Sequence, residues 1–260
     1  MSEALIALPF GLAIGLIVGG VGGGGAILAV PLLVYALGEG VGPASTASLI
    51  VIAVAAAVGA GALAFRGHVC WRLALTFSVP AAAGSLLGTF AGAAVSPKAL
   101  ILAFVPVMLV AAGAAWRGGG DPRDDGPGEC PAPAWRRILV AGFGVGILTG
   151  FFGVGGGFLI VPVLTLWLGT SFRRSVATSL VIVTLTGLAA LAGHLGSGSG
   201  INVAITVALA ASTALGAFAG TMVGRRLPQA QLRRAFAVVV TAVAVLLLVD
   251  TLFLGGPPGG

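Results

Sequence analysis

The stretch GLAIGLIVGGVGGGGAILAVP at residues 11–31 is repeated at residues 142–162 as GFGVGILTGFFGVGGGFLIVP. This match indicates that the fold is built from two similar halves. At an offset of 131, the matched positions are Gly11, Gly15, Gly19, Gly22, Gly24, Gly25, Val30 and Pro31 on Gly142, Gly146, Gly150, Gly153, Gly155, Gly156, Val161 and Pro162. Farther along, Gly84-x3-Gly88-Thr89 matches Gly216-x3-Gly220-Thr221 at an offset of 132. A register kept over about a hundred residues indicates an internal duplication. We therefore divide the chain into an N-terminal repeat at 1–117, a linker at 118–135 and a C-terminal repeat at 136–260.

The composition excludes a water-soluble protein. Of the 260 residues, 58% are hydrophobic and 8% are charged, whereas soluble domains carry ~25% charged residues. The uncharged stretches are 4–38, 40–65, 73–97, 99–116, 138–172, 175–224 and 235–249. A helix that spans a bilayer needs ~20 apolar residues, and most of these stretches reach that length. Because the ~10-residue alternating segments of a membrane barrel are absent, the sequence predicts an all-α integral membrane protein.

The few charged residues predict the topology. Arg66 and Arg72 border the second loop of the first repeat, while the corresponding loop of the second repeat has no Lys or Arg. Conversely, Arg173 and Arg174 lie in the first loop of the second repeat, whose counterpart carries Glu39 alone. Because basic loops face the cytoplasm, the two repeats are expected to be inserted upside down relative to each other. The linker 118–135, rich in Pro and Gly and flanked by Arg, is then cytoplasmic in a multi-pass membrane protein.

The first segment of each repeat is too long for one simple span. Residues 4–38 and 138–172 are each 35 residues long, or ~52 Å as one helix, against a hydrocarbon core of ~30 Å. A cluster of glycines, which disfavour helix, lies in the middle of each. We expect each segment to be a Gly-broken helical hairpin, either re-entrant or made of two short spans. Three transmembrane helices follow in each repeat, giving about eight segments in all.

Two interpretations of the glycines remain open. The series with Gly at every fourth residue, such as Gly11, Gly15 and Gly19, suits close helix packing. Close packing explains the consecutive glycines at 22–25 and 155–157 poorly, because a packing face needs glycine only at every fourth residue. Consecutive glycines instead expose backbone N–H groups, which is tolerated in a membrane where they line a cavity or meet a ligand. Together with the N-terminal end of the helix that restarts at Ala26 or Phe158, two such breaks would form an anion site without charged side chains. The letters Gly20-x-Gly22-x-x-Gly25 also match a dinucleotide fingerprint, but that motif requires a preceding β-strand.

Small hydroxyl residues follow each hairpin. They could donate hydrogen bonds to an anion or coordinate a cation, but hydrogen bonds between helices or to the preceding turn explain them equally well. The complete predicted substrate-binding set is Gly22, Gly23, Gly24, Gly25, Ala26, Thr46, Ser48, Gly153, Gly155, Gly156, Gly157, Thr178 and Ser179. His68 and His194 are expected to be solvated loop residues. Arg173 and Arg174 could attract anions, although topology alone explains them.

The sequence as a whole resembles the TauE/SafE sulfite-exporter family of membrane permeases. The motifs that carry the resemblance are the repeated GVGGG(x)4P element, Thr46-Ala47-Ser48-Leu49, Ala177-Thr178-Ser179-Leu180, the loop Arg66-Gly67-His68-Val69-x-Trp71 and the Gly-x3-Gly third helix. The resemblance covers nearly the whole chain and implies transport of sulfite, thiosulfate or organosulfonate-type anions across the plasma membrane. The second repeat departs from the loop motif at 193–198.

The remaining residues favour a transporter over other classes. No charged residue falls inside a predicted span, which disfavours coupling through a buried carboxylate. With no clustered metal ligands, nucleophile constellation or phosphate loop, we expect no enzyme activity, cofactor or metal site. Cys70 and Cys130 lie in different loops and are expected to be free thiols. The expected partners are a small anion and the lipid bilayer, with a homo-oligomer left open and nucleic acid excluded. The alternatives are a passive anion channel and a non-transporting subunit of a membrane assembly.

Overall fold

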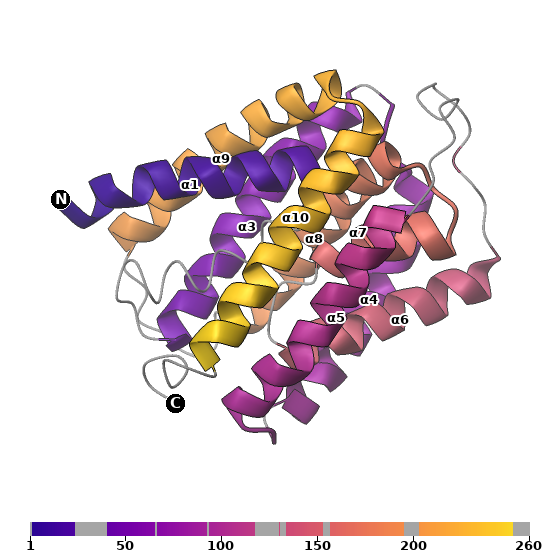
Figure 1. Ribbon diagram of the computed structural model, residues 1–260, viewed down its shortest axis with the longest axis horizontal. Coiled ribbons are helices and arrows are strands. Elements are labelled where there is room, and N and C mark those ends of the chain that lie inside the picture. The colour runs from indigo at the N-terminus through magenta and orange to yellow at the C-terminus, as the bar shows by residue number, and fades with distance from the viewer. Residues whose placement is uncertain are drawn as a thin grey trace.

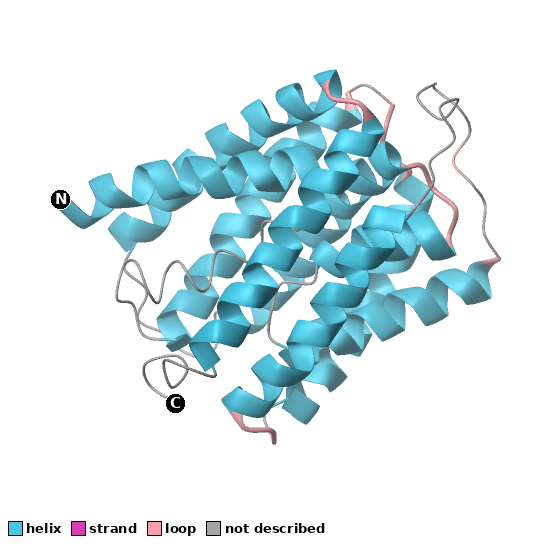
Figure 2. Ribbon diagram, viewed as in Figure 1, coloured by secondary structure: helices cyan, strands magenta, loops and turns pink. Residues whose placement is uncertain are grey.

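The structure is a computed structural model that describes residues 2–23, 41–65, 67–92, 94–117, 130, 134–152, 157–194 and 203–251. Within these ranges all regular structure is helical, as Figure 2 shows. The first repeat contributes α1 (Ser2–Val21), α3 (Val41–Ala64), α4 (Trp71–Gly92) and α5 (Pro97–Arg117). The second contributes α6 (Trp135–Phe152), α7 (Gly157–Pro162), the π-helical turn η4 (Val163–Trp167), α8 (Phe172–His194), α9 (Val203–Arg226) and α10 (Gln229–Val249).

Seven helices in the described residues are long and apolar enough to cross a membrane. They lie in α3, α4, α5, α6, α8, α9 and α10. Their outward surfaces carry large apolar side chains that water would not tolerate in such number, including Val79, Leu86, Phe90, Val110 and Leu215. The all-α, multi-pass membrane class predicted from composition is therefore confirmed.

The two repeats are interlocked rather than set side by side. The first helix of one repeat packs along the third helix of the other: α1 lies against α9, and α6 lies against α4. Figure 1 shows α1 and α9 running together along one edge of the bundle, with α4 and α6 together near the opposite edge. The equivalent helices α3 and α8 pack on each other, as do α5 and α10. Contacts exchanged in this reciprocal way are what a two-fold relation between the repeats produces.

The glycine series explains why these pairs form. A Cβ added at Gly142 would lie 2.8 Å from the carbonyl oxygen of Phe77, and one at Gly84 would lie 3.0 Å from the amide nitrogen of Ile147. Hydrophobic burial does not drive helices together in lipid, so close backbone approach at small residues must supply the packing energy. Corresponding glycines hold α1 against α9, where Gly11, Gly15, Gly19, Gly216 and Gly220 leave no room for a side chain. The packing interpretation of the spaced glycines is confirmed.

The two arms of the second hairpin are unequal. Helix α6 has 18 residues, or ~27 Å, which is close to the thickness of a hydrocarbon core. The second arm combines six residues of α7 with five of η4, which amounts to only ~16 Å. It cannot cross a membrane, and it is buried over the whole of α7. Instead of two short spans, the second repeat therefore has one spanning arm and one short buried arm, joined at 153–156.

The expectation of free thiols is wrong, because Cys70 and Cys130 form a disulfide with their Cα atoms 5.8 Å apart. The two residues are 60 positions apart in the sequence, and the bond ties the loop before α4 to the linker between the repeats. Two cysteines in separate loops carry no spacing signal, so nothing in the sequence indicated that Cys130 lies beside the start of α4.

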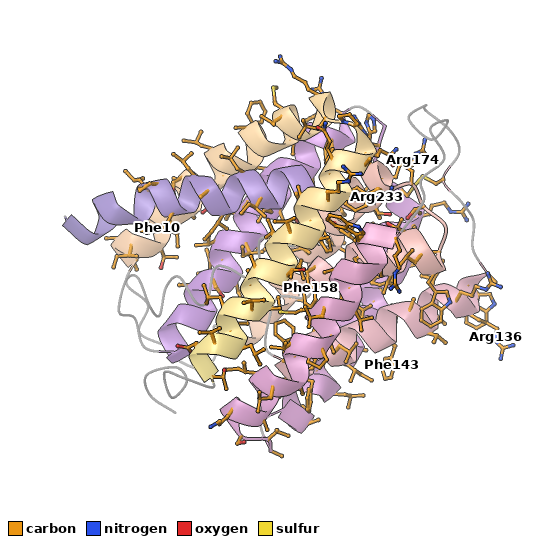
Figure 3. All side chains as sticks on the ribbon, in the orientation of Figure 1. Phe10, Arg136, Phe143, Phe158, Arg174 and Arg233 are labelled. Atoms are coloured by element: carbon orange, nitrogen blue, oxygen red, sulfur yellow. A yellow bond between two sulfur atoms is a disulfide. The ribbon has the colours of Figure 1, made fainter. Side chains whose placement is uncertain are left out.

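Contacts among described residues gather the basic segments at one end of the bundle, named here the basic end. They are the disulfide Cys70–Cys130, the contact of Arg174 with Cys130, the hydrogen bonds from Arg173 to the carbonyls of Arg225 and Leu227, and the Arg234 guanidinium 6.0 Å above the Trp116 ring. In Figure 3, Arg136 and Arg174 both lie toward the right-hand side, away from Phe10. The alternating charge pattern of the loops is thus matched by a common location of the basic segments.

Candidate functional site

The two glycine-rich breaks meet in space. Gly23, just after α1, lies against Gly157, the first residue of α7, and their backbones are in direct contact. A Cβ built on Gly157 would fall 2.5 Å from the Cα of Gly23, and one built on Gly23 would be just as close to Gly157. Real Cβ atoms do not approach so closely, so both positions require glycine. We name this contact the glycine junction.

Gly22 and the start of α8 border the glycine junction. Gly22 has a φ of +87°, a conformation that residues with a side chain rarely adopt. A Cβ there would lie 2.9 Å from the Oγ of Ser179 and 3.0 Å from Cγ2 of Val161. The positive φ turns the chain out of α1 at this point, and it brings the break of the first repeat onto α7 and α8 of the second.

Two of the predicted hydroxyls lie on the second turn of α8 and are fully buried. The Oγ1 of Thr178 accepts a hydrogen bond of 3.2 Å from the backbone N–H of Cys70. The Oγ of Ser179 donates to the carbonyl of Val176, three residues earlier, at 2.8 Å. Thr178 thus bonds to another segment and Ser179 to the preceding turn, which are the two structural roles that the sequence left open for these hydroxyls. The single proton of the Ser179 hydroxyl is used on Val176, so this hydroxyl can donate to an anion only after it releases that carbonyl.

The structure brings together only part of the predicted set. Gly22, Gly23, Gly157 and Ser179 meet at the glycine junction, and Thr178 precedes Ser179 on α8. Ser48 is buried on α3, a helix that packs on α8. The predicted residues outside the described ones are Gly24, Gly25, Ala26, Gly153, Gly155 and Gly156, together with the side chain of Thr46. The helix predicted to restart at Phe158 begins one residue earlier, at Gly157.

Phe158 anchors the short arm against the rest of the bundle. Its ring packs edge-to-face on Phe104 of α5, with centroids 5.3 Å apart, and Phe104 also contacts Phe152 at the end of α6. Figure 3 shows Phe158 in the interior between α5 and α10. Aromatic pairs of this kind stabilise packing by ~0.5–1.5 kcal/mol beyond burial. They fix both sides of the break in the second repeat, and with it the position of Gly157.

A buried hydroxyl cluster that the sequence reasoning missed closes the turn between η4 and α8. The Oγ1 of Thr165 donates to the Oγ of Ser175 at 2.9 Å, and Thr170 bonds both to that oxygen and to the carbonyl of Leu164. These contacts return the chain from the short arm into α8, and so they position Ser179. The signal was visible as four hydroxyl residues within eleven positions, at 165–175, next to two arginines.

The two arginines at the start of α8 have structural partners. Arg173 donates to the carbonyls of Arg225 and Leu227 at 3.0 and 3.1 Å, which satisfies acceptors at the C-terminal end of α9. Arg174 is buried, and its Nη1 lies 3.6 Å from the Sγ of Cys130. His68 is half-buried in the loop before α4 instead of being freely solvated.

The glycine junction is electrically neutral in its side chains. Glycine, valine, serine and threonine line it, so hydrogen bonds from backbone N–H and hydroxyl groups are the chemistry it can offer. Within the described residues, no group of three or more His, Cys, Asp or Glu is placed to hold a metal ion.

Comparisons with known proteins bear on the family of the chain. The model of the sulfite exporter TauE/SafE family matches residues 7–247. The chain is 31% identical over 256 residues to a "Probable membrane transporter protein" of Xylella fastidiosa strain Temecula1, with 95% of this chain and 96% of that protein aligned. A protein of the same name from strain 9a5c is 30% identical, with the same coverage. No solved structure matches the chain.

Proposed function

Because the chain belongs to the sulfite exporter TauE/SafE family of membrane transporters, we propose that its substrate is a small anion of the sulfite, thiosulfate or organosulfonate type. The observation that carries this proposal is the glycine junction, where two breaks from opposite repeats meet beside buried hydroxyls. Broken hydrophobic segments at corresponding positions of two repeats are the best pointer to the binding site of a secondary transporter. The substrate would bind there, among backbone N–H groups and the hydroxyl of Ser179.

Alternating access supplies the transport step of the proposal. The pairs α1–α9 and α4–α6 are each tied by glycine contacts along their length, so each pair is expected to move as a unit. The glycine junction joins the end of α1 to the start of α7, so it links the α1–α9 pair to the short arm that follows α6. Rocking of one pair against the other would expose the junction first to one side of the membrane and then to the other.

We infer the orientation in the membrane from the basic end. Arginines at the ends of α5, α6, α8, α9 and α10 share it, and Lys and Arg are enriched in cytoplasmic loops. We therefore place the basic end and the linker 118–135 on the cytoplasmic side of the cell membrane. The arginines would also raise the local concentration of an anionic substrate at that mouth.

Ligand-dependent thermal unfolding of the purified protein tests the proposed site. Sulfite, thiosulfate, methanesulfonate and chloride are compared on wild type, Gly157→Ala and the matched control Gly144→Ala, whose new Cβ meets no atom within 4 Å. At a concentration of about 100 Kd, a ligand that binds the folded state stabilises it by ~2.7 kcal/mol. We expect one of the sulfur oxyanions to stabilise wild type and Gly144→Ala, and to leave Gly157→Ala unchanged.

A second variant covers the case in which Gly157→Ala does not fold. Ser179→Ala removes one hydroxyl from the edge of the glycine junction and creates no clash, and it should weaken anion affinity by roughly tenfold, as the loss of one hydrogen bond to a charged group does. If Ser179→Ala and Gly144→Ala bind the anion with equal affinity, the glycine junction is not the binding site. Flux that does not saturate with anion concentration would identify a passive channel instead of a carrier.

A further inference from the structure

The Cys70–Cys130 disulfide has an uneven environment. The Sγ of Cys130 belongs to an exposed residue, whereas Cys70 is 2% exposed and lies inside the bundle. A nucleophile that cleaves a disulfide attacks one sulfur from the side opposite the other. Because Cys130 is exposed and Cys70 is buried, Cys130 is the sulfur open to attack and Cys70 is the leaving group.

Both products of such an attack would be stabilised by groups already in place. The Arg174 guanidinium, 3.6 Å from the Sγ of Cys130, would attract an incoming anion and then pair with a negative group formed on that sulfur. Cys70 directly precedes α4, and its carbonyl accepts the first helical hydrogen bond, from Ala74. A thiolate at Cys70 would therefore sit at the N-terminal end of a 22-residue helix, where negative charge is favoured.

We propose that Cys130 is a reaction site for a sulfite-type sulfur nucleophile. This inference rests on the proposed function for the identity of the nucleophile. The lone pair of the sulfite sulfur forms a bond to the Sγ of Cys130, and the bond between the two cysteines breaks. Its electron pair leaves with Cys70 as a thiolate, so sulfite sulfur is oxidised, Cys70 is reduced, and no other oxidant is needed. The product is an S-sulfonate on Cys130 beside Arg174.

The location of the disulfide agrees with a reactive role. The proposed orientation places it on the cytoplasmic side, where disulfides are rare and those that form are mostly transient or redox-sensing. It is also tied to the helix that borders the glycine junction, since the backbone N–H of Cys70 donates to Thr178, the residue before Ser179 on α8. Cleavage would free the linker from the start of α4, next to the proposed binding site. The substrate itself would thus open the bond.

Mass spectrometry of the full-length protein in detergent tests the proposal. The protein, purified without reductant, is incubated with sulfite or with sulfate, a dianion that cannot act as a sulfur nucleophile. Free thiols are then labelled with a maleimide. We expect sulfite to produce one S-sulfonate on Cys130 and one labelled thiol at Cys70, and sulfate to produce neither. Arg174→Gln should slow the reaction by about tenfold, whereas Arg72→Gln, which removes an exposed charge near Cys70, should not.

Three outcomes would overturn the proposal: two free thiols in the untreated protein, a sulfonate on Cys70, or no product at a sulfite concentration and pH that cleave oxidised glutathione. Equal rates in Arg174→Gln and Arg72→Gln would remove the role of Arg174. Sulfite binding to Cys130→Ser separates the two proposals. If that variant binds sulfite while the wild-type disulfide stays intact, the reaction site is wrong and the transport site stands.

Discussion

At the scale of single residues, the absence of side chains organises this protein as much as their presence. Gly23 and Gly157 meet backbone to backbone, and the positive φ of Gly22 lets the chain turn toward them. A methyl group at any of the three would fall within 3.0 Å of a neighbouring atom, closer than real Cβ atoms approach. Polar groups around the junction are therefore backbone amides and short hydroxyls, which can meet an anion while costing less to bury than a charged side chain.

Replacing Thr178 tests the bond that links α8 to the loop before α4. In Thr178→Val the buried N–H of Cys70 loses its acceptor, which should lower the free energy of unfolding by about 1–3 kcal/mol. Thr178→Ser keeps the oxygen and should retain most of that stability. Denaturant unfolding in detergent, followed by circular dichroism, compares the two variants. Equal stability of Thr178→Val and Thr178→Ser would show that the bond contributes nothing.

At the scale of helices, glycine spacing determines which helices pair. Gly146 of α6 faces Ala81 of α4 so closely that an added Cβ would lie 2.8 Å from the Ala81 carbonyl carbon, while Gly144 on the opposite face has open space. Gly146→Ala should destabilise the protein by about 1–3 kcal/mol, as overpacking does, whereas Gly144→Ala should cause no loss. Thermal unfolding midpoints in the same detergent provide the measurement. A midpoint for Gly146→Ala at or above that of Gly144→Ala would contradict the pairing.

The sequence predicted the helical class, the spaced-glycine packing faces and the grouping of the basic loops, because each depends on a pattern that repeats along the chain. It could not distinguish two short spans from one long and one short arm, since the glycines at 153–157 mark a break without fixing the length of either side. The disulfide and the hydroxyl cluster around Ser175 were also missed. Both depend on where loops fold back, and loops carry no periodicity. The sequence also did not predict that α1 packs against α9 of the other repeat, because a glycine face does not indicate which helix it contacts.

At the scale of the whole molecule, the interlocked repeats and the basic end define how the protein should sit in a membrane. Reporter fusions at residues 41, 119 and 198 should report outside, inside and outside, respectively. Residue 41 begins α3, which ends at the basic end, and residue 198 follows α8, which begins at the basic end. Each of these two positions is therefore one membrane crossing away from the cytoplasmic side. A cytoplasmic signal at 198 would overturn the inverted insertion of the repeats. It would also move the Cys70–Cys130 disulfide out of its proposed compartment if the signal at 119 were external.

A sulfur oxyanion is proposed to cross the membrane through the glycine junction. Counterflow in proteoliposomes tests it most directly: vesicles loaded with unlabelled sulfite take up labelled sulfite from outside only if a carrier exchanges the two. Wild type and Gly144→Ala should show saturable counterflow, and Gly23→Ala and Gly157→Ala should lose most of it while remaining folded. Counterflow at the wild-type rate in folded Gly23→Ala and Gly157→Ala would contradict the account.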